Sequence, residues 1–377
     1  MIPFNRPICW PDQTQPLLDE MHRSRHMSGD GPLGQRATAL LSSVHNGATV
    51  ALTPSCTQAL EIAALAIDLQ PGDEVVMPDF TFTSTATAVV MAGGTPVFAD
   101  VSPDTLNLDP DSVANAIGPR TRAIIAVNYA GVACDFVALG DIAQKHGLVL
   151  IEDNAHGLGG TDHGQPLGTM SRFSCLSFHE TKNISCGEGG AIVIADPADV
   201  EAVEILREKG TNRAAFFRGS VAKYNWVGRG SSYLLAEPLV AYLLPQLERL
   251  DEITARRRAI WERYAIELAG WAAQYGVGLP TVPDGCEQPG HLFYVLLSDL
   301  ERREELRTHL GANGILAPFH YQSLSAAPAG QRYGRTPAVP TVSRSVADRM
   351  LRLPLFYDLT DAQQGEVIDS VIAYVGS

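Results

Sequence analysis

Positive charge, long apolar runs and paired cysteines are all scarce in this sequence of 377 residues. Its 28 lysine and arginine residues face 42 aspartate and glutamate residues, so the net charge is −14. A field of that sign repels the phosphates of nucleic acids. No apolar run reaches the roughly 18 residues that a membrane span requires. We therefore expect neither nucleic acid nor a membrane as a partner.

The cysteines form no metal-binding or disulfide pattern. The six are Cys9, Cys56, Cys134, Cys175, Cys186 and Cys286. None pairs with another at CxxC spacing, which argues against a zinc site and a disulfide framework. The first residues, MIPFNRPICW, lack the basic region and the continuous apolar stretch of a signal peptide. Because reduced thiols are typical of the cytoplasm, we expect a cytoplasmic protein without a metal site.

The chain does contain a regular alternation of short β-branched runs with helical stretches. Candidate strands span 74–77, 95–99, 123–128 and 148–152, and the helices between them include 57–69 and 137–146. Such alternation predicts parallel strands joined by helical crossovers. The strands are apolar throughout, as expected when helices cover both faces of a sheet. The predicted fold class is α/β with a mostly parallel sheet.

The pattern changes after residue 183. AIVIAD predicts one more strand, 200–208 a helix, 210–230 an irregular stretch and 237–269 one connecting helix. Beyond it, HLFYVLLSDL, a helix at 302–310 and ILAPFHY indicate a smaller α+β unit. Since single cores stop growing at about 250–300 residues, we expect two domains, 1–250 and 251–377.

Polar residues gather at three places suited to ligand binding. VLIEDNAH ends its strand with Asp153, and parallel sheets bind ligands beyond the carboxyl ends of their strands. In TPSCTQALEIAALAI, hydroxyl groups and free N–H groups precede a helix and can bind an anion. Simple N-capping explains Ser55 or Thr57, but it explains the whole cluster less readily. SFHETKNISCGEGG places Lys182 in a short polar turn.

One ligand, pyridoxal phosphate (PLP), requires these three elements together. It needs an anion site for its phosphate, a carboxylate beside its pyridine nitrogen and a lysine that forms a Schiff base with its aldehyde. A lone lysine in a loop is more often a solvated surface charge. Here a strand-like SRFSCLSF precedes Lys182 and GEGGAIVI follows it, so the turn is expected to be held in place.

Motifs along the whole chain resemble those of the DegT/DnrJ/EryC1/StrS family of sugar-nucleotide aminotransferases. They are MIPFNRP, TPSC, PDFTFTSTATAV, NYAGVACD, IEDNAHG, SFHETKN followed by GEGG, REKGTNR, FFRG, GSSYL, FHY and LRLPLFYDL. The resemblance implies fold type I, the α/β fold of aspartate aminotransferase. In it a large PLP-binding domain is joined to a smaller C-terminal α+β domain. The resemblance also implies a homodimer or a dimer-based tetramer.

The resemblance assigns roles around the cofactor ring. It implies that Lys182 bonds the aldehyde, that Asp153 pairs with the ring nitrogen and that His156 lies beside the phenolic oxygen. Phe82 matches the aromatic residue that stacks on the ring, and His179 matches a catalytic-turn residue on the substrate side. Taken singly, Phe82 is more often a core residue and His179 a satisfied turn histidine.

The resemblance also implies how the cofactor phosphate is held. Ser55, Cys56 and Ser177 match the phosphate contacts, Cys56 through its backbone N–H. The family completes this site with an asparagine of a second subunit from a GYN-like motif. This sequence has GSSY there, so Ser232 replaces the asparagine, and Asn225 in KYNW is a candidate substitute.

A nucleotide diphosphate requires positive charge near the substrate. The candidates are Arg213, Arg218 and Arg229, and a surface ion pair explains each of them equally well. His320 and Tyr321 match a family HY pair near the substrate. The continuation SLS replaces the usual PLH, and AEPLVA replaces SDLQAA. Both departures lie on the substrate and interface side, so they affect sugar specificity more than transamination.

The reaction implied by the resemblance moves an amino group from glutamate to a nucleotide-linked ketosugar. The most specific form converts dTDP-4-dehydro-6-deoxyglucose to dTDP-4-amino-4,6-dideoxygalactose. The alternatives are another ketosugar position or nucleotide, and a non-catalytic sugar-nucleotide binding or regulatory protein. Such a binder is expected to lose Lys182, Asp153 or the phosphate serines, and none is lost. Family members that dehydrate the sugar carry histidine at the lysine position, so Lys182 argues against that activity.

Overall fold

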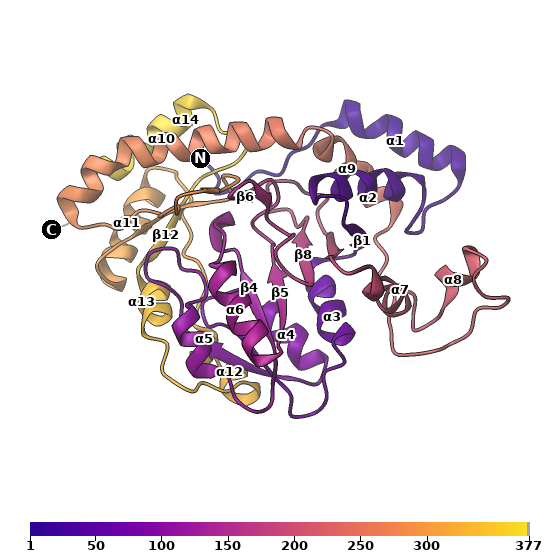
Figure 1. Cartoon of the computed structure of the whole chain (residues 1–377). Coiled ribbons are helices and arrows are strands. Elements are labelled where there is room, and N and C mark those ends of the chain that lie inside the picture. The colour runs from indigo at the N-terminus through magenta and orange to yellow at the C-terminus, as the bar shows by residue number, and fades with distance from the viewer. Residues whose placement is uncertain (375–377) are drawn as a thin grey trace.

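A seven-stranded sheet forms the centre of the computed structural model, which describes residues 1–374 (Figure 1). The strand order is β1-β9-β8-β5-β4-β2-β3. Strand β9 runs antiparallel to β1 and β8, and the pairs from β8 to β3 are all parallel. The strands are β1 (Thr49–Thr53), β2 (Glu74–Pro78), β3 (Thr95–Ala99), β4 (Thr121–Val127), β5 (Val149–Asp153), β8 (Phe173–Ser177) and β9 (Gly190–Ile194). The predicted α/β fold with a mostly parallel sheet is confirmed.

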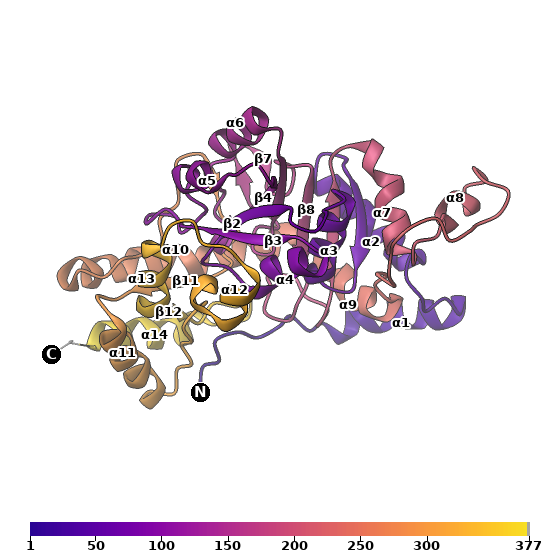
Figure 2. The same cartoon turned by 90° about the horizontal axis from the view of Figure 1, so that it is seen from below.

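Helices cover both faces of this sheet (Figure 2). One face packs against α3 (Cys56–Ala66), α4 (Thr83–Met91) and α7 (Val200–Arg207). The other packs against α5 (Pro110–Ala116) and α6 (Phe136–His146) over β2–β4, and against α2 (Pro32–Val44) and α9 (Glu237–Leu247) over β1, β9 and β8. Side chains alternate between the two faces along a strand. In β2, Val75 and Met77 therefore meet the first cluster and Val76 the second, and all three are fully buried.

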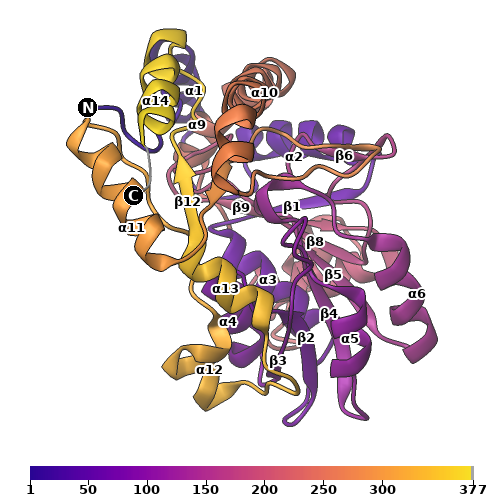
Figure 3. The ribbon, with the colours of Figure 1, turned by 90° about the vertical axis from the view of Figure 1, so that its left-hand side faces the viewer.

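A separate hydrophobic cluster lies in the C-terminal part of the chain. It is built on α10 (Leu250–Tyr275), β11 (Phe293–Leu296), β12 (Met350–Leu353) and α14 (Asp361–Ala373) (Figure 3). Apart from Ile2, its buried residues all follow residue 250. Ile2 joins it because the first residues form a bridge to Ile315. This distribution agrees with a division near residue 250, which stays a prediction.

The remaining elements are short or peripheral. They are α1 (Pro11–Ser24), β6 (Thr161–Asp162), β7 (Gln165–Pro166), α8 (Arg213–Phe217), β10 (Cys286–Glu287), α11 (Leu300–Ala312), α12 (Pro328–Tyr333) and α13 (Thr341–Arg349), with 3-10 turns at Tyr129–Gly131, Pro197–Asp199 and Leu324–Ala326. Within residues 1–374, no helix combines the length and the hydrophobicity that crossing a bilayer requires.

Two predicted segments differ from the structure. The run 237–269 is not one helix, because the chain leaves the helical conformation at Arg249 (φ −120°, ψ 27°), between α9 and α10. This turn allows Leu247 and Leu250 to enter the same hydrophobic cluster. The stretch 210–230 is not wholly irregular, since it contains α8. A helix of five residues is too short to show a hydrophobic period in the sequence.

We predict that Gly190→Ala destabilises the protein. A Cβ at Gly190 would lie 2.5 Å from the backbone nitrogen of Cys56 and 2.5 Å from the carbonyl carbon of Ser55, and backbone atoms cannot move aside as a flexible side chain can. Overpacking of this kind costs about 1–3 kcal/mol, measured as the free energy of unfolding in urea. Gly140→Ala is the matched control, because nothing lies within 4 Å of its Cβ position in α6. It should stabilise by about 0.5–1 kcal/mol, and equal effects of the two variants would contradict the close approach.

Candidate active site

Three strands bring the predicted anion-binding residues together. Thr53, Gly190 and Ser177 are paired across β1, β9 and β8, so they form one row at the end of these strands. Helix α3 begins directly after this row, and Gly190 packs against the backbone of Ser55 and Cys56. The structure thus places Ser55, Cys56 and Ser177 at one edge of the sheet, although they are distant along the chain.

The first turn of α3 retains free hydrogen-bond donors. Ser55 is the N-cap, and its Oγ accepts a 3.2 Å hydrogen bond from the N–H of Gln58, so the N-capping interpretation holds for this serine. The N–H groups of Cys56 and Thr57 donate to no backbone carbonyl of residues 1–374. Burial raises the pKa of the Cys56 thiol well above its ordinary value, so this side chain stays uncharged. A helix N-terminus with free N–H groups attracts a phosphate.

Asp153 ends β5 as a buried carboxylate, with 5% of its surface exposed. Its Oδ2 accepts a 2.8 Å hydrogen bond from the hydroxyl of Thr85, and its Oδ1 accepts one from the N–H of Ala155. Burial raises the pKa of Asp153, while these two hydrogen bonds and the charge of Lys182 oppose that shift. Thr85 was not predicted, because nothing in PDFTFTSTATAV distinguishes its hydroxyl from those of the neighbouring threonines.

Lys182 lies in a tightly bonded turn between β8 and β9. Its N–H donates to the carbonyl of His179 at 2.9 Å, and the N–H groups of Glu180 and Phe178 donate to the carbonyls of Gly187 and Gly189. Burial is the largest cause that lowers the pKa of Lys182 to about 8, while Cys56 and Asp153 raise it. A lysine with this pKa has a minor neutral fraction near physiological pH, and a neutral amine is the form that acts as a base or nucleophile.

Three histidines stack beside Lys182. The ring centroids of His156 and His291 are 4.1 Å apart, and those of His156 and His320 are 6.0 Å apart. Burial is the main cause that lowers the pKa of all three well below the ordinary value, and the charge of Lys182 adds to it in each case. They therefore act as neutral hydrogen-bonding groups. His291 was not predicted, because it follows a loop whose sequence carries no recognisable pattern.

Tyr321 and Phe82 lie at the same site. The hydroxyl of Tyr321 is 3.4 Å from Nε2 of His156, and its ring centroid is 6.1 Å from that of Phe82. Burial and then the charge of Asp153 raise the pKa of Tyr321, so its phenol stays uncharged. Phe82 is 56% exposed, which excludes the core interpretation and leaves its ring free to stack on a ligand.

Two serines hold the segment that carries His320 and Tyr321. In the SLS sequence, Oγ of Ser323 donates to Oδ2 of Asp79 at 2.5 Å, and the N–H of Ser325 donates to Oδ1 at 2.6 Å. Both serines and Asp79 are buried. The departure from PLH thus attaches this segment to the end of β2, next to Phe82.

His179 lies on the outer side of the lysine turn. Its Nδ1 is 3.0 Å from the hydroxyl of Thr181, and its Nε2 is 3.7 Å from Oε1 of Glu188. It does not line the cavity beside Lys182. These contacts are those of a satisfied turn histidine, and a catalytic role for His179 stays a prediction.

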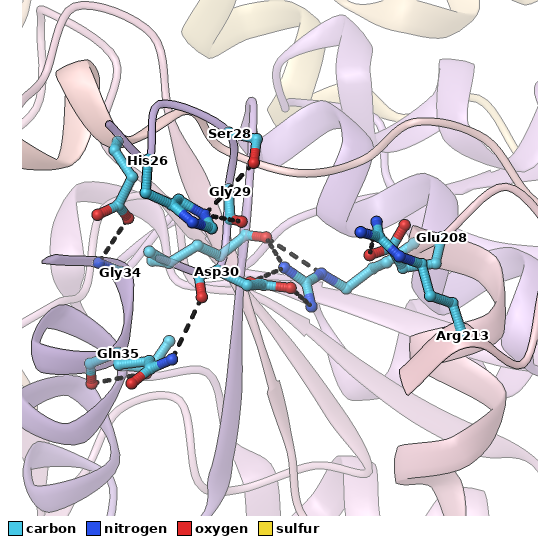
Figure 4. Close-up of polar contacts among 12 residues, drawn as sticks. His26, Ser28, Gly29, Asp30, Gly34, Gln35, Glu208 and Arg213 are labelled. Carbon is cyan, nitrogen blue, oxygen red and sulfur yellow. Dashed lines mark hydrogen bonds and ion pairs between the residues drawn. The ribbon is translucent and has the colours of Figure 1, made fainter. Parts of the chain in front are cut away.

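The three candidate substrate arginines form ion pairs away from Lys182. Arg213 lies beside Glu208, with 3.4 Å between Nη1 and Oε1 (Figure 4). Nη2 of Arg218 donates to Oε2 of Glu204 at 2.7 Å, and Arg229 pairs with Asp68. Within this chain the surface ion-pair interpretation therefore describes all three, and their role toward a nucleotide stays a prediction.

The segment that follows α7 and contains α8 projects from the rest of the chain (Figure 1). In the sequence Asn225 falls within this segment, and Ser232 falls where it returns to the end of α7. The backbone of Asn225 bonds to Asn212, and Ser232 forms an isolated bridge with Glu208. Neither lines the cavity beside Lys182. Because the segment projects from the chain, its predicted contact with a cofactor phosphate requires the site of a second subunit.

We predict that Lys182 reacts with an amine-specific reagent with a pH midpoint near 8, instead of 10.5, in cofactor-free protein. Asp153→Asn should move the midpoint lower still, because the carboxylate charge favours the protonated amine. Mass spectrometry of the Lys182 peptide measures the reaction. Asp141→Asn, an exposed change on α6, is the control and should leave the midpoint unchanged. A wild-type midpoint near 10.5, or a higher midpoint in Asp153→Asn, would contradict the site.

These groups fit PLP. A buried carboxylate, a lysine whose pKa burial has lowered and a helix N-terminus with free N–H groups converge at the carboxyl ends of β5 and β8 and the start of α3. The charge of Asp153 acts on Lys182, so this carboxylate and the amine lie near each other.

The chain is similar to known sugar aminotransferases along nearly its whole length. It is 36% identical over 319 residues to dTDP-3-amino-3,4,6-trideoxy-alpha-D-glucose transaminase of Streptomyces venezuelae, covering 83% of this chain and 79% of that protein. Its fold matches DesV of S. venezuelae with a TM-score of 0.90 and 32% identity, covering 100% and 99% of the two chains. It also matches Spr1654 of Streptococcus pneumoniae in its PLP form, with a TM-score of 0.89, 26% identity and coverage of 98% and 97%. Residues 12–372 match the family described as the DegT/DnrJ/EryC1/StrS aminotransferase family, and this chain belongs to it.

Proposed function

We propose that this PLP-dependent sugar-nucleotide aminotransferase takes its amino group from glutamate and transfers it to dTDP-4-dehydro-6-deoxyglucose. The product is dTDP-4-amino-4,6-dideoxygalactose. The observation that carries the proposal is the convergence of Lys182 and Asp153 on one buried space beside a helix N-terminus. A non-catalytic binding protein has no need for a lysine whose pKa is lowered in this way.

The residues of the site have separate chemical tasks. When bound, PLP supplies an aldehyde that accepts the amino group and a ring that withdraws electrons from the reacting carbon. Lys182 in its neutral form would remove a proton from the α-carbon of the donor, and in the second half-reaction its protonated form would supply a proton to the acceptor carbon. Asp153 would keep a proton on the ring nitrogen of the bound cofactor, and Thr85 orients this carboxylate through its hydroxyl. His156 provides a neutral hydrogen-bond partner, since burial lowers its pKa.

The identity of the sugar rests on sequence motifs and on named relatives. The 4-keto acceptor is supported by the family resemblance of the whole set of sequence motifs, which include GSSYL and LRLPLFYDL. A dTDP-linked acceptor is supported by the name of the S. venezuelae relative, which is a dTDP-sugar transaminase. That same name favours a second candidate, amination at carbon 3, because the relative makes a 3-amino sugar.

A homodimer, alone or within a tetramer, is the proposed functional unit. The segment that carries Asn225 and Ser232 exposes large aromatic side chains, among them Trp226 at 83% and Phe217 at 70%. Exposed aromatic residues gathered on one segment are typical of protein interfaces. A second subunit would bury them and bring the segment to its partner's site.

We predict that the purified protein, with PLP and glutamate, converts dTDP-4-dehydro-6-deoxyglucose and places the new amine on carbon 4. Nuclear magnetic resonance of the product gives its position and stereochemistry. The 3-keto isomer and nucleotides other than dTDP complete the panel. Amination at carbon 3 only would favour the second candidate, and no amination of any ketosugar would reject the proposal.

We predict that Lys182→Ala loses turnover by about 10⁴-fold or more while the protein stays folded, because removal of a covalent catalytic group has an effect of this size. Lys145→Ala, in the last turn of α6, is the control and should retain turnover. The unfolding temperature of each variant separates lost chemistry from lost folding. Full turnover of Lys182→Ala would contradict the assignment of Lys182 as the catalytic amine.

A further inference from the structure

A small cavity opens beside Lys182, on the side of the C-terminal cluster. Its volume is about 40 Å³, and the polar groups around it include His156, His291, His320 and Arg352. A cavity of this size admits at least one water-sized group. Among residues 1–374, no aspartate or glutamate lines it. Its polar lining therefore favours an anion.

Arg352 lines this cavity and forms no ion pair with a carboxylate of residues 1–374. It lies on β12, and its Nη2 donates to the carbonyl of Phe319 at 3.0 Å. Its Cζ lies 4.4 Å from the ring centroid of Phe4, so an aromatic face covers one side of the guanidinium. Nε is buried and has no hydrogen-bond partner in the described chain, and no carboxylate of residues 1–374 lies within 4.0 Å of the guanidinium.

A partly buried guanidinium without a carboxylate is costly in free energy. Burial lowers the pKa of Arg352, which is the expected consequence. Two arginines that are more deeply buried are satisfied differently. Arg257 donates to three backbone carbonyls, and Arg207 pairs with Asp30. Arg352 lines a cavity together with Lys182 and has no carboxylate partner in the described chain, so its missing partner is expected to come from a ligand.

The ligand's anionic group must lie close to the reacting carbon, because Lys182 and Arg352 line one small cavity. In an amino acid donor, the α-carboxylate is attached to the carbon from which Lys182 removes a proton. In a nucleotide-linked ketosugar, the atoms of the sugar ring separate the diphosphate from the carbon that receives the amine. The guanidinium of an arginine can also donate two parallel hydrogen bonds to one carboxylate. The geometry therefore favours the amino donor, and not the ketosugar acceptor, as the substrate whose anionic group binds Arg352.

We infer that Arg352 binds the α-carboxylate of the amino donor. The inference rests on the proposed function, since it requires an amino acid as the donor. In this arrangement the amino donor and the ketosugar acceptor react at the same centre but contact different residues. The donor is recognised by the guanidinium beside Lys182, while the acceptor has to be recognised by other residues.

The experiment separates the two half-reactions of the holoenzyme. Glutamate converts the PLP form with a loss of visible absorbance, and the ketosugar restores it. Arg352→Met should raise the half-saturating glutamate concentration about 10- to 100-fold, the effect of losing hydrogen bonds to a charged group. It should leave the half-saturating ketosugar concentration unchanged. Arg332→Met, which removes an exposed arginine that packs on Tyr333, is the matched control and should change neither.

A binding measurement without turnover tests the same site independently. Glutarate has two carboxylates and no amine, so it should bind the wild-type holoenzyme in calorimetry and bind Arg352→Met at least about tenfold more weakly. If Arg352→Met does not fold, Arg352→Lys and Arg352→Gln decide the question. The lysine variant keeps the charge, so it should bind glutarate and glutamate more tightly than the glutamine variant.

Three results would overturn the inference. They are unchanged affinity for both dicarboxylates in Arg352→Met, equal affinities of the lysine and glutamine variants, and a loss confined to the ketosugar half-reaction, which would place a phosphate at Arg352. Failure of the proposed function is recognised separately, because glutamate would then leave the visible absorbance of the wild-type PLP form unchanged. Glutarate binding that depends on Arg352 would still support the anion site in that case.

Discussion

The electrostatic coupling of Lys182 with Asp153 is the interaction on which the rest of the site depends. Each group is costly to bury as a charge, and each favours the charged form of the other. Burial prevails for Lys182, whose pKa falls to about 8, and the amine is therefore available in its neutral form. The same burial acts on Asp153, where Thr85 and the N–H of Ala155 oppose it. A carboxylate and an amine with these properties are the two groups that PLP chemistry requires of a protein.

The fold brings these groups together through its topology. Asp153 ends β5, Lys182 follows the neighbouring β8, and the α3 N-terminus follows β1 two strands further along the sheet. The antiparallel β9 lies between β1 and β8, and its first residue, Gly190, allows the backbone of α3 to approach closely. The lysine turn is thus fixed between two ordered strands. Glycines surround it because Gly187 has a positive φ of 87° and because a Cβ at Gly189 or Gly190 would lie 2.5 Å from neighbouring atoms.

Much of this arrangement could be predicted from the sequence, because its causes are local. Apolar β-branched runs predicted the strands, and the order of Asp153 and Lys182 along the chain indicated the cofactor. Contacts that depend on tertiary packing could not be predicted in this way. His291 and Arg352 reach the site from the C-terminal part of the chain, and Thr85 is one of several similar threonines. The break at Arg249 escaped prediction because both halves of the run 237–269 are good helix formers. The contacts proposed for Asn225 and Ser232 involve a second subunit, so a single chain contains no test of them.

The account assigns the covalent chemistry to one of only four lysines, Lys145, Lys182, Lys209 and Lys223. Borohydride reduction of the holoprotein fixes the cofactor to the lysine that bonds it, and peptide mass spectrometry then identifies that residue. The account predicts that the cofactor mass is found on the peptide that contains Lys182. Its recovery on a peptide with any of the other three lysines would contradict the central claim.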